Sequence, residues 1–230
     1  HSASFLSFAS RELKDSELCF LSRHSSICFF SANDKGRLHP LDFPGQDYLP
    51  EDLPEILKYS GKTNAAFTRM MINTSLSLTP FAADSGSGIT VADPMCGKGT
   101  TLFSALQTGF SAVGIDSDKR YTHEAVNFFT RYLRRHGLKH RVNEGSETRG
   151  GRAIPVTGFS FSSSKEGYLS CDVRTLRIGT GDAADLRAVA RGMKVSIIVA
   201  DLPYGIQHAP RDKGGLALFH DLLPRVLPEW

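Results

Sequence analysis

The 230-residue sequence has few cysteines, little net charge and no long apolar run. Its four cysteines stand far apart and form no Cys-x-x-Cys pair, so we expect neither a metal site nor a disulfide framework, and a reducing, cytoplasmic compartment. No stretch approaches the roughly 18 consecutive apolar residues of a membrane span, so we expect no membrane association. With 21 glycines and 11 prolines, the composition also excludes collagen-like and low-complexity classes.

The net charge of +3 is too small to identify a nucleic-acid-binding protein by itself. The basic residues are unevenly distributed, however, and one segment without any acid carries Arg131, Arg134, Arg135, His136, Lys139, His140 and Arg141. This segment is either a solvated helix face or a stripe that contacts phosphates.

The first fifty residues differ in pattern from the rest. Two short apolar runs, Leu18–Leu21 and Ile27–Phe30, predict a hairpin or two separate strands. Four prolines then interrupt the chain, at Pro40, Pro44, Pro50 and Pro54, and indicate that 31–54 is a linker or an extended arm. We therefore expect a small N-terminal extension over 1–54 and one main domain over 55–230.

Helical spacing begins shortly after this boundary. The apolar positions that recur on one predicted face are Phe67, Met70, Met71, Thr74 and Leu78. Thr63 or Asn64 can cap the start of this helix, and Pro80 lies just beyond its end. We expect Met70 and Met71 to pack in the core rather than to contact a cofactor.

From Ile89 onward, predicted strands and helices alternate. Strands are expected at Ile89–Ala92, Ala112–Ile115, Leu176–Ile178 and Val195–Ala200. Helices are expected at Thr101–Thr108, around Ala125–Leu133, and in the last segment through Leu218, Phe219, Leu222, Leu223 and Val226. This order predicts an α/β fold with a doubly wound, mostly parallel sheet. A polar, Gly- and Ser-rich stretch at about 143–170 predicts an inserted loop or hairpin.

The segment from Asp93 to Thr101, Asp-Pro-Met-Cys-Gly-Lys-Gly-Thr-Thr, lies between the first of these strands and its helix. It is not a Walker A loop, which would need glycine at Ala92 and serine or threonine at Gly99. It also lacks the third glycine of a dinucleotide fingerprint, because Leu102 stands there. The segment therefore has an acidic residue at the end of a strand, followed by a glycine turn whose backbone can approach a ligand closely. A tight turn without a ligand is the alternative.

Two further acids end predicted strands. Asp116, after the second strand, can accept hydrogen bonds from both hydroxyls of a ribose, which would suit any nucleoside cofactor. Asp182 follows the third strand, where it is either a helix N-cap or a cofactor contact.

The fourth strand is followed by Asp201-Leu202-Pro203-Tyr204-Gly205. The Asp201 carboxylate and a backbone carbonyl near Pro203 can accept both protons of an exocyclic amino group, while Tyr204 stacks on the ring. These contacts would orient the nitrogen lone pair toward a methyl donor bound at the glycine turn. A purely structural turn is the other interpretation.

Taken in order after the helix Phe67-Thr68-Arg69-Met70-Met71-Ile72-Asn73, these motifs resemble class I S-adenosylmethionine-dependent methyltransferases of the amino-modifying kind. Within that class, the set is similar to the RNA methylase family that includes tRNA guanine-N2 methyltransferases. The resemblance covers about 60 to 208 and implies a Rossmann-like domain that binds S-adenosyl-L-methionine. It implies catalytic roles for Asp201, Pro203 and Tyr204, and cofactor contacts from Asp93, Pro94, Met95, Cys96, Gly97, Gly99, Thr100, Asp116, Ser117 and Asp182.

The implied function is methylation of an exocyclic amino nitrogen of a nucleobase in RNA, with guanine N2 of tRNA as the expected target. The chain departs from the family pattern at Leu202, which replaces the first of two common prolines, and it ends one helix after the fourth strand, so we expect it to lack the C-terminal strands. The alternatives are a DNA adenine-N6 or cytosine-N4 methyltransferase and a non-catalytic scaffold that binds S-adenosylmethionine or RNA.

Overall fold

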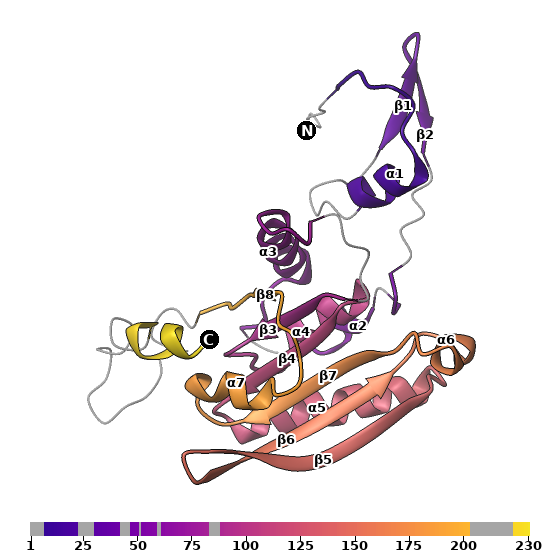
Figure 1. The fold of residues 1–230 in the computed structure, drawn as a ribbon. Helices are drawn as coiled ribbons and strands as arrows, with labels where there is room; N and C mark the ends of the chain where they lie inside the picture. The colour runs from indigo at the N-terminus through magenta and orange to yellow at the C-terminus, as the bar shows by residue number, and fades with distance from the viewer. Residues whose placement is uncertain are drawn as a thin grey trace. The chain divides into compact units, whose positions relative to one another are not determined.

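The structure is a computed structural model that describes residues 7–22, 30–41, 47–50, 52–58, 61–82, 88–202 and 223–230 (Figure 1). The chain divides into two compact units, 1–46 and 47–230. The larger unit carries every residue for which the sequence predicts a catalytic or cofactor-binding role.

The N-terminal unit contains the helix α1 (Asp15–Ser22) and a hairpin of β1 (Ser31–Asp34) and β2 (Arg37–Pro40). The predicted strand at Leu18–Leu21 is therefore wrong, because these residues lie in α1, whose first turn carries Asp15 and Glu17 where acids favour a helix start. Of the second predicted run, 27–29 lie outside the described residues.

The linker or extended arm predicted over 31–54 is wrong for 31–40 and 53–54, while 42–46 and 51 lie outside the described residues. The hairpin occupies its first part, and the short helix α2 (Leu53–Ile56) its end. Lys35 and Gly36 both have positive φ (48° and 86°) and connect the two strands of the hairpin. Two-residue turns of this kind match the twist of paired strands. The prediction of a linker rested on the prolines and did not take this turn into account.

The larger unit is built on a six-stranded sheet in the order β5-β6-β7-β4-β3-β8. Its strands are β3 (Thr90–Asp93), β4 (Ser111–Asp116), β5 (His140–Arg149), β6 (Arg152–Phe161), β7 (Arg174–Thr180) and β8 (Ile197–Ile198). β7, β4, β3 and β8 are parallel, whereas β5 and β6 pair antiparallel at one edge. This confirms the α/β class with a mostly parallel sheet, an arrangement compatible with a Rossmann-like fold.

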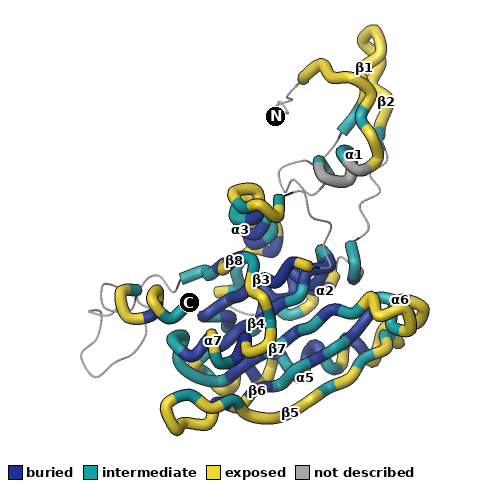
Figure 2. The backbone as a smooth tube through the Cα atoms, in the orientation of Figure 1, coloured by how far each residue is buried: buried dark blue, intermediate teal, exposed yellow. Residues whose placement is uncertain are grey.

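Helices pack on both faces of this sheet, and its central strands are largely buried (Figure 2). The buried hydrophobic residues form two clusters. The remaining helices are α3 (Ala65–Ser77), α4 (Thr100–Gln107), α5 (Lys119–Arg135), α6 (Lys165–Leu169) and α7 (Leu186–Val189), with 3-10 turns η1 (Ala183–Asp185) and η2 (Leu227–Glu229). Ala112 of β4 belongs to the cluster under α4 and α5, and its neighbour Val113 to the cluster under α7. Within the described residues, no helix is both long and apolar enough to cross a membrane.

The inserted segment is a hairpin, which confirms one of its two predicted forms. β5 and β6 pair over ten residues each and extend the sheet beyond β7. Gly150 and Gly151 make the connection with positive φ (55° and 78°). The short helix α6 follows, so the segment is ordered structure rather than an open loop.

The predicted helix before Pro80 is confirmed as α3, but its predicted inner face is wrong. Asn64 caps it by accepting hydrogen bonds from the N–H groups of Ala66 and Phe67 at 2.8 and 3.1 Å. The buried positions are Ala65, Thr68, Ile72 and Leu76, with Met71 partly buried against the same core. The expected core residues Phe67, Met70, Thr74 and Leu78 are exposed. Both sets satisfy helical spacing, and the packing of α3 on α4 and β8 selects the second.

One predicted element in the last third is shorter in the structure, and another is described only in part. β8 comprises Ile197–Ile198 within the expected strand Val195–Ala200. In the predicted final helix, 223–226 are helical, and 218–222 lie outside the described residues.

Candidate functional site

The carboxyl ends of the parallel strands bring acids from distant parts of the sequence together. Asp93 is the last residue of β3, Asp116 is the last residue of β4, and Asp201 follows β8. From central β3 the chain proceeds to β4 and β7 on one side, then crosses to β8 on the other. Such a topological switch point leaves a crevice where open α/β sheets bind their ligands.

The glycine turn is tied to β4 by backbone groups. The Cys96 N–H donates to the Ile115 carbonyl at 3.0 Å, and the Gly97 N–H donates to Asp116 Oδ2 at 2.8 Å. Gly97 and Gly99 both have positive φ (52° and 92°), a region that favours glycine. A Cβ built on Gly97 would meet nothing within 4 Å, so a ligand can approach the backbone there.

Gly114 in β4 allows the turn to pack this closely. A Cβ at this position would lie 2.8 Å from the Cys96 Cβ and 2.8 Å from the Leu102 Cδ1. The first turn of α4 and the glycine turn therefore rest directly on the β4 backbone.

Asp93 is buried, with 2% of its surface exposed. Burial raises the pKa of its carboxyl to about 7, and the charges of Asp116 and Asp201 act in the same direction. Hydrogen bonds from the Met95 N–H, at 2.9 Å, and from the Thr101 hydroxyl oppose this shift without cancelling it. The three acids are thus electrostatically coupled.

Asp116 is half-buried and accepts two backbone hydrogen bonds, from Gly97 at Oδ2 and from the Asp118 N–H at Oδ1, the latter at 2.8 Å. Burial raises the pKa of Asp116 despite these bonds. Its carboxylate therefore organises both the glycine turn and the start of α5, a structural role that the sequence pattern did not indicate.

Asp201 is partly buried, and its Oδ2 accepts a hydrogen bond from the Thr63 hydroxyl. From the sequence, Thr63 was only one of two alternative helix caps. The structure places it beside an acid 138 positions later. The other two predicted catalytic residues, Pro203 and Tyr204, lie outside the described residues.

Asp182 is the N-cap of η1, accepting from the Ala184 N–H at 2.9 Å, as one of its two sequence interpretations predicted. It also accepts a hydrogen bond from Arg225 Nη1 at 3.0 Å. Although burial opposes ionisation, these donors hold the pKa of Asp182 below its ordinary value. Its cofactor contact stays a prediction.

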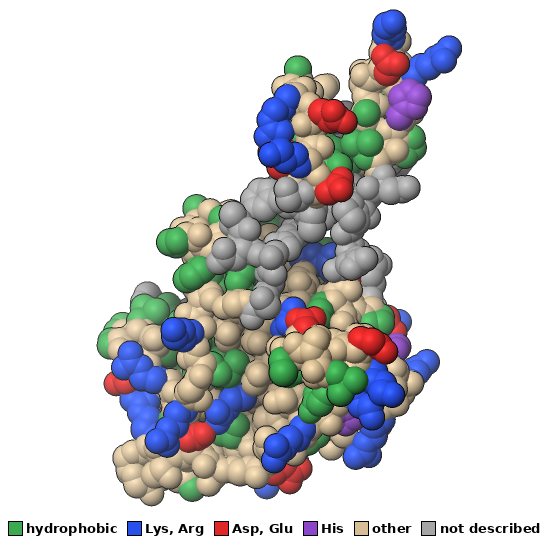
Figure 3. All heavy atoms as spheres, turned by 45° about the vertical axis from the view of Figure 1, so that its right-hand side comes forward, with side chains coloured by type: hydrophobic (Ala, Val, Ile, Leu, Met, Phe, Trp, Pro, Cys, Tyr) green, Lys and Arg blue, Asp and Glu red, His purple; other side chains and the backbone are tan. Residues whose placement is uncertain are grey.

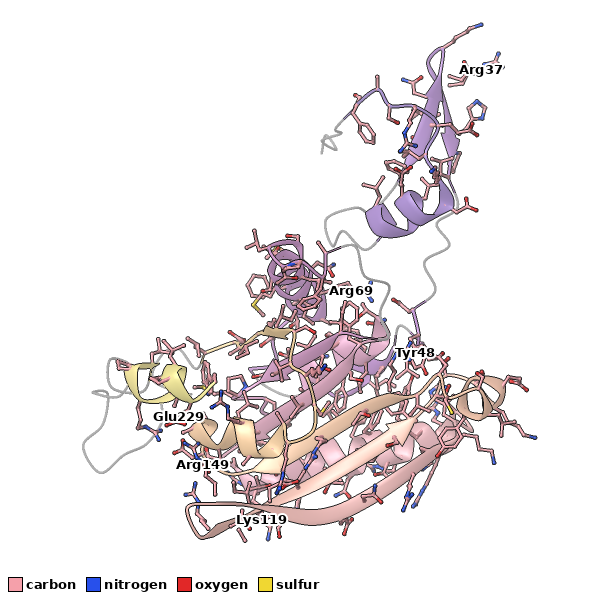
Figure 4. All side chains as sticks on the ribbon, in the orientation of Figure 1. Arg37, Tyr48, Arg69, Lys119, Arg149 and Glu229 are labelled. Atoms are coloured by element: carbon pink, nitrogen blue, oxygen red, sulfur yellow. The ribbon has the colours of Figure 1, made fainter. Side chains whose placement is uncertain are left out.

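The C-terminal residue Trp230 is hydrogen-bonded next to Asp182. Trp230 Nε1 donates to the Ala183 carbonyl at 2.9 Å. Arg149 in the β5–β6 hairpin pairs with Glu229 at 2.6 Å (Figure 4).

The remaining predicted cofactor residues lie in or beside the turn. Pro94, Cys96 and Thr100 are buried, Met95 is partly exposed, and Ser117 is exposed. Burial raises the pKa of the Cys96 thiol well above its ordinary value, so it is not a reactive thiolate. Lys98 within the turn pairs with Glu124 of α5 at 2.5 Å.

In the part of the chain that the structure describes, no group of three or more His, Cys, Asp or Glu side chains is arranged to hold a metal ion. Comparisons with protein-family models, with curated proteins and with solved structures found no match to this chain. The functional conclusion therefore depends on the chemistry of the site itself.

Proposed function

We propose that the unit 47–230 binds S-adenosyl-L-methionine at this edge of the sheet and methylates an exocyclic amino nitrogen of a nucleobase in RNA. Guanine N2 of a tRNA is the acceptor that we favour. The observation that supports this proposal is the convergence of Asp93, Asp116 and Asp201 around a glycine turn at the switch point of the sheet.

The donor set fits a ligand that is both a nucleoside and a cation. The hydrogen-bond donors described for these three acids are backbone N–H groups and the hydroxyls of Thr63 and Thr101, which carry no net charge. Burial is the main cause of the raised pKa of Asp93, and the charges of Asp116 and Asp201, which these neutral donors do not offset, add to it. A ligand with a sulfonium and an α-ammonium group would offset the charge of Asp93 and Asp116, the two acids that we assign to the cofactor.

Asp116 also has capacity for a ribose. An ionised carboxylate offers about four lone-pair sites, and two backbone N–H groups occupy only part of them. Its partly exposed position permits hydrogen bonds from ribose hydroxyls, while the open backbone at Gly97 permits close approach of the rest of the ligand. S-adenosylmethionine supplies an electrophilic methyl group on its sulfonium: the S–CH3 bond breaks as the N–CH3 bond forms, S-adenosylhomocysteine leaves as a neutral thioether, and the amino nitrogen releases one proton to solvent.

Asp201 is the residue that we assign to the acceptor base. The Thr63 hydroxyl fixes one carboxylate oxygen, Oδ2, and the other oxygen can accept a proton of an exocyclic amino group. That hydrogen bond strengthens as the nitrogen develops positive charge during transfer, so it favours the transition state over the ground state. Pro203 and Tyr204 keep their predicted roles as carbonyl acceptor and stacking partner.

The test measures transfer of labelled methyl from S-adenosylmethionine to total tRNA by the full chain. Asp201→Asn should lower the rate by roughly 10²–10³-fold, as loss of one preorganised electrostatic partner does, and should leave cofactor affinity nearly unchanged in calorimetry. Glu144→Gln, on the exposed edge strand, is the matched control and should keep the wild-type rate.

A wild-type rate in Asp201→Asn would contradict the assigned mechanism. Cofactor binding without methylation of any RNA would favour the non-catalytic scaffold. Methylation of DNA in place of RNA would favour the adenine-N6 or cytosine-N4 alternative.

A further inference from the structure

The C-terminal end of α5 carries a basic surface, which we define as Arg131, Arg134, Arg135 and Lys139. The three arginines stand at helix positions i, i+3 and i+4, so they share one face. All four side chains are exposed. In Figure 3, which brings the side bearing α6 forward, Lys and Arg side chains lie at the left, bottom and right of the larger unit, with Asp and Glu side chains among them.

Within the described residues, none of these four side chains forms an ion pair, although Asp52 interacts with Tyr132 of the same helix. The sequence contains no Asp or Glu between Glu124 and Glu144. Asp172, an acid at the same edge of the sheet, pairs with Arg174 at 2.5 Å. Cations at a helix C-terminus stabilise the helix, which accounts for Arg134 and Arg135. Lys139 lies beyond the helix end, so this explanation does not cover it.

The structure separates Arg141 from the other basic residues of the run. In the β5–β6 register, Val142 is opposite Phe159 and Arg141 is opposite Ser160. Val142 and Phe159 belong to the core under α5, and successive residues of a strand point to opposite faces. Arg141 therefore lies on the other face of the sheet and serves as an internal control.

The basic surface lies far from the acid cluster. α5 begins beside the site, where the Asp118 N–H donates to Asp116. Its 17 residues span about 25 Å at 1.5 Å per residue. The helix ends near the amino ends of the parallel strands (Figure 1). There His140, the first residue of β5, is in register with Phe161, and Phe161 is in register with Arg174, the first residue of β7.

We propose that this surface binds the phosphate backbone of the substrate RNA while the acceptor base occupies the acid cluster at the other end of α5. The substrate is then a folded RNA long enough to bridge about 25 Å, not a mononucleotide or a short oligomer. The bridging part rests on the proposed function, because that function places the base at the acids. Cationic side chains that neutralise phosphates release counterions, which makes such binding strongly dependent on salt.

The experiment compares binding of a folded tRNA transcript to the full chain over a range of salt concentrations. Arg134→Gln combined with Arg135→Gln removes two charges from the surface. Arg141→Gln combined with Arg187→Gln removes two exposed charges on the other face of the sheet and is the matched control. We expect the first pair to weaken binding and to make the slope of log affinity against log salt shallower by about 1.4–1.8, from roughly 0.7–0.9 per phosphate contact. The control pair should leave the slope close to wild type.

Guanosine supplies the control for the acceptor site, because it carries no phosphate and cannot reach both ends of α5. Its binding should be equal in wild type and in the Arg134/Arg135 pair. Equal salt slopes in the two pairs would overturn the proposal, and so would an equal loss of affinity for the nucleoside and the transcript.

If the Arg134/Arg135 pair lost binding to anionic lipid vesicles but kept its RNA binding, the surface would be assigned to a membrane, and the proposal would also be overturned. If the Arg134/Arg135 pair lowers RNA binding but wild type transfers no methyl group, the surface stands and the proposed function fails. If wild type methylates RNA and the Arg134/Arg135 pair leaves both RNA binding and the methylation rate unchanged, the proposed function stands and the proposal for the basic surface fails.

Discussion

Replacement of Asp93 by asparagine should remove a pH-dependent cost from the folded state. The pKa of Asp93 is raised from 3.8 to about 7, mainly by burial. Between pH 3.8 and about 7, its carboxyl is therefore protonated in the native state and ionised in the unfolded state. By linkage, the free energy of unfolding of the wild type falls as pH rises through this window. A shift of about three units, at 1.36 kcal/mol each, corresponds to a cost of about 4 kcal/mol above pH 7.

Asparagine cannot ionise, and its amide oxygen can still accept the Met95 N–H. The Asp93→Asn variant should therefore become more stable than wild type as pH rises, by up to about 4 kcal/mol, less about 1 kcal/mol for a poorer hydrogen bond. Urea unfolding at a series of pH values from about 4 to above 7 measures the difference.

Asp118→Asn is the control for this comparison. Hydrogen bonds from Arg120 lower the pKa of the partly exposed Asp118 to about 2, and this residue caps α5. The stability that its charge contributes is present above its ordinary pKa of 3.8 and is lost only as pH falls toward 2. Its difference from wild type should stay flat across the Asp93 window. An equally flat difference for Asp93→Asn would refute the argument that this carboxyl is held protonated by burial.

Three further expectations follow from the same geometry. Gly114→Ala should lower the free energy of unfolding by roughly 1–3 kcal/mol in urea titrations, since its Cβ would lie 2.8 Å from Cys96 and Leu102, whereas Gly145→Ala, where a Cβ meets nothing within 4 Å, should cost much less. Asp116→Ala should weaken S-adenosylmethionine binding in calorimetry by roughly 1–3 kcal/mol, and equal affinity would contradict its assignment. Thr63→Val should lower kcat for methyl transfer, with Thr63→Ser restoring it. Asn64→Ala should cost about 1 kcal/mol of stability with kcat unchanged.

The sequence by itself determined the elements whose signals are local. Asn64 capping α3 and the turn from Asp93 to Thr101 each depend on a few neighbouring residues, and both lie where the pattern predicts. The order of strands and helices in turn predicted the mostly parallel sheet, because a crossover helix between strands places them parallel.

The tertiary structure alone decided which face of an element is buried and which distant groups meet. The spacing in α3 allowed two inner faces, and packing on α4 and β8 selected the one with Ile72 and Leu76. The pairing of β5 with β6 turned Arg141 away from the other basic residues of its run. The contact between Thr63 and Asp201 joins residues 138 positions apart. No local propensity encodes such choices, because they depend on the free energy of burying one surface against another, which exists only once the partner is in place.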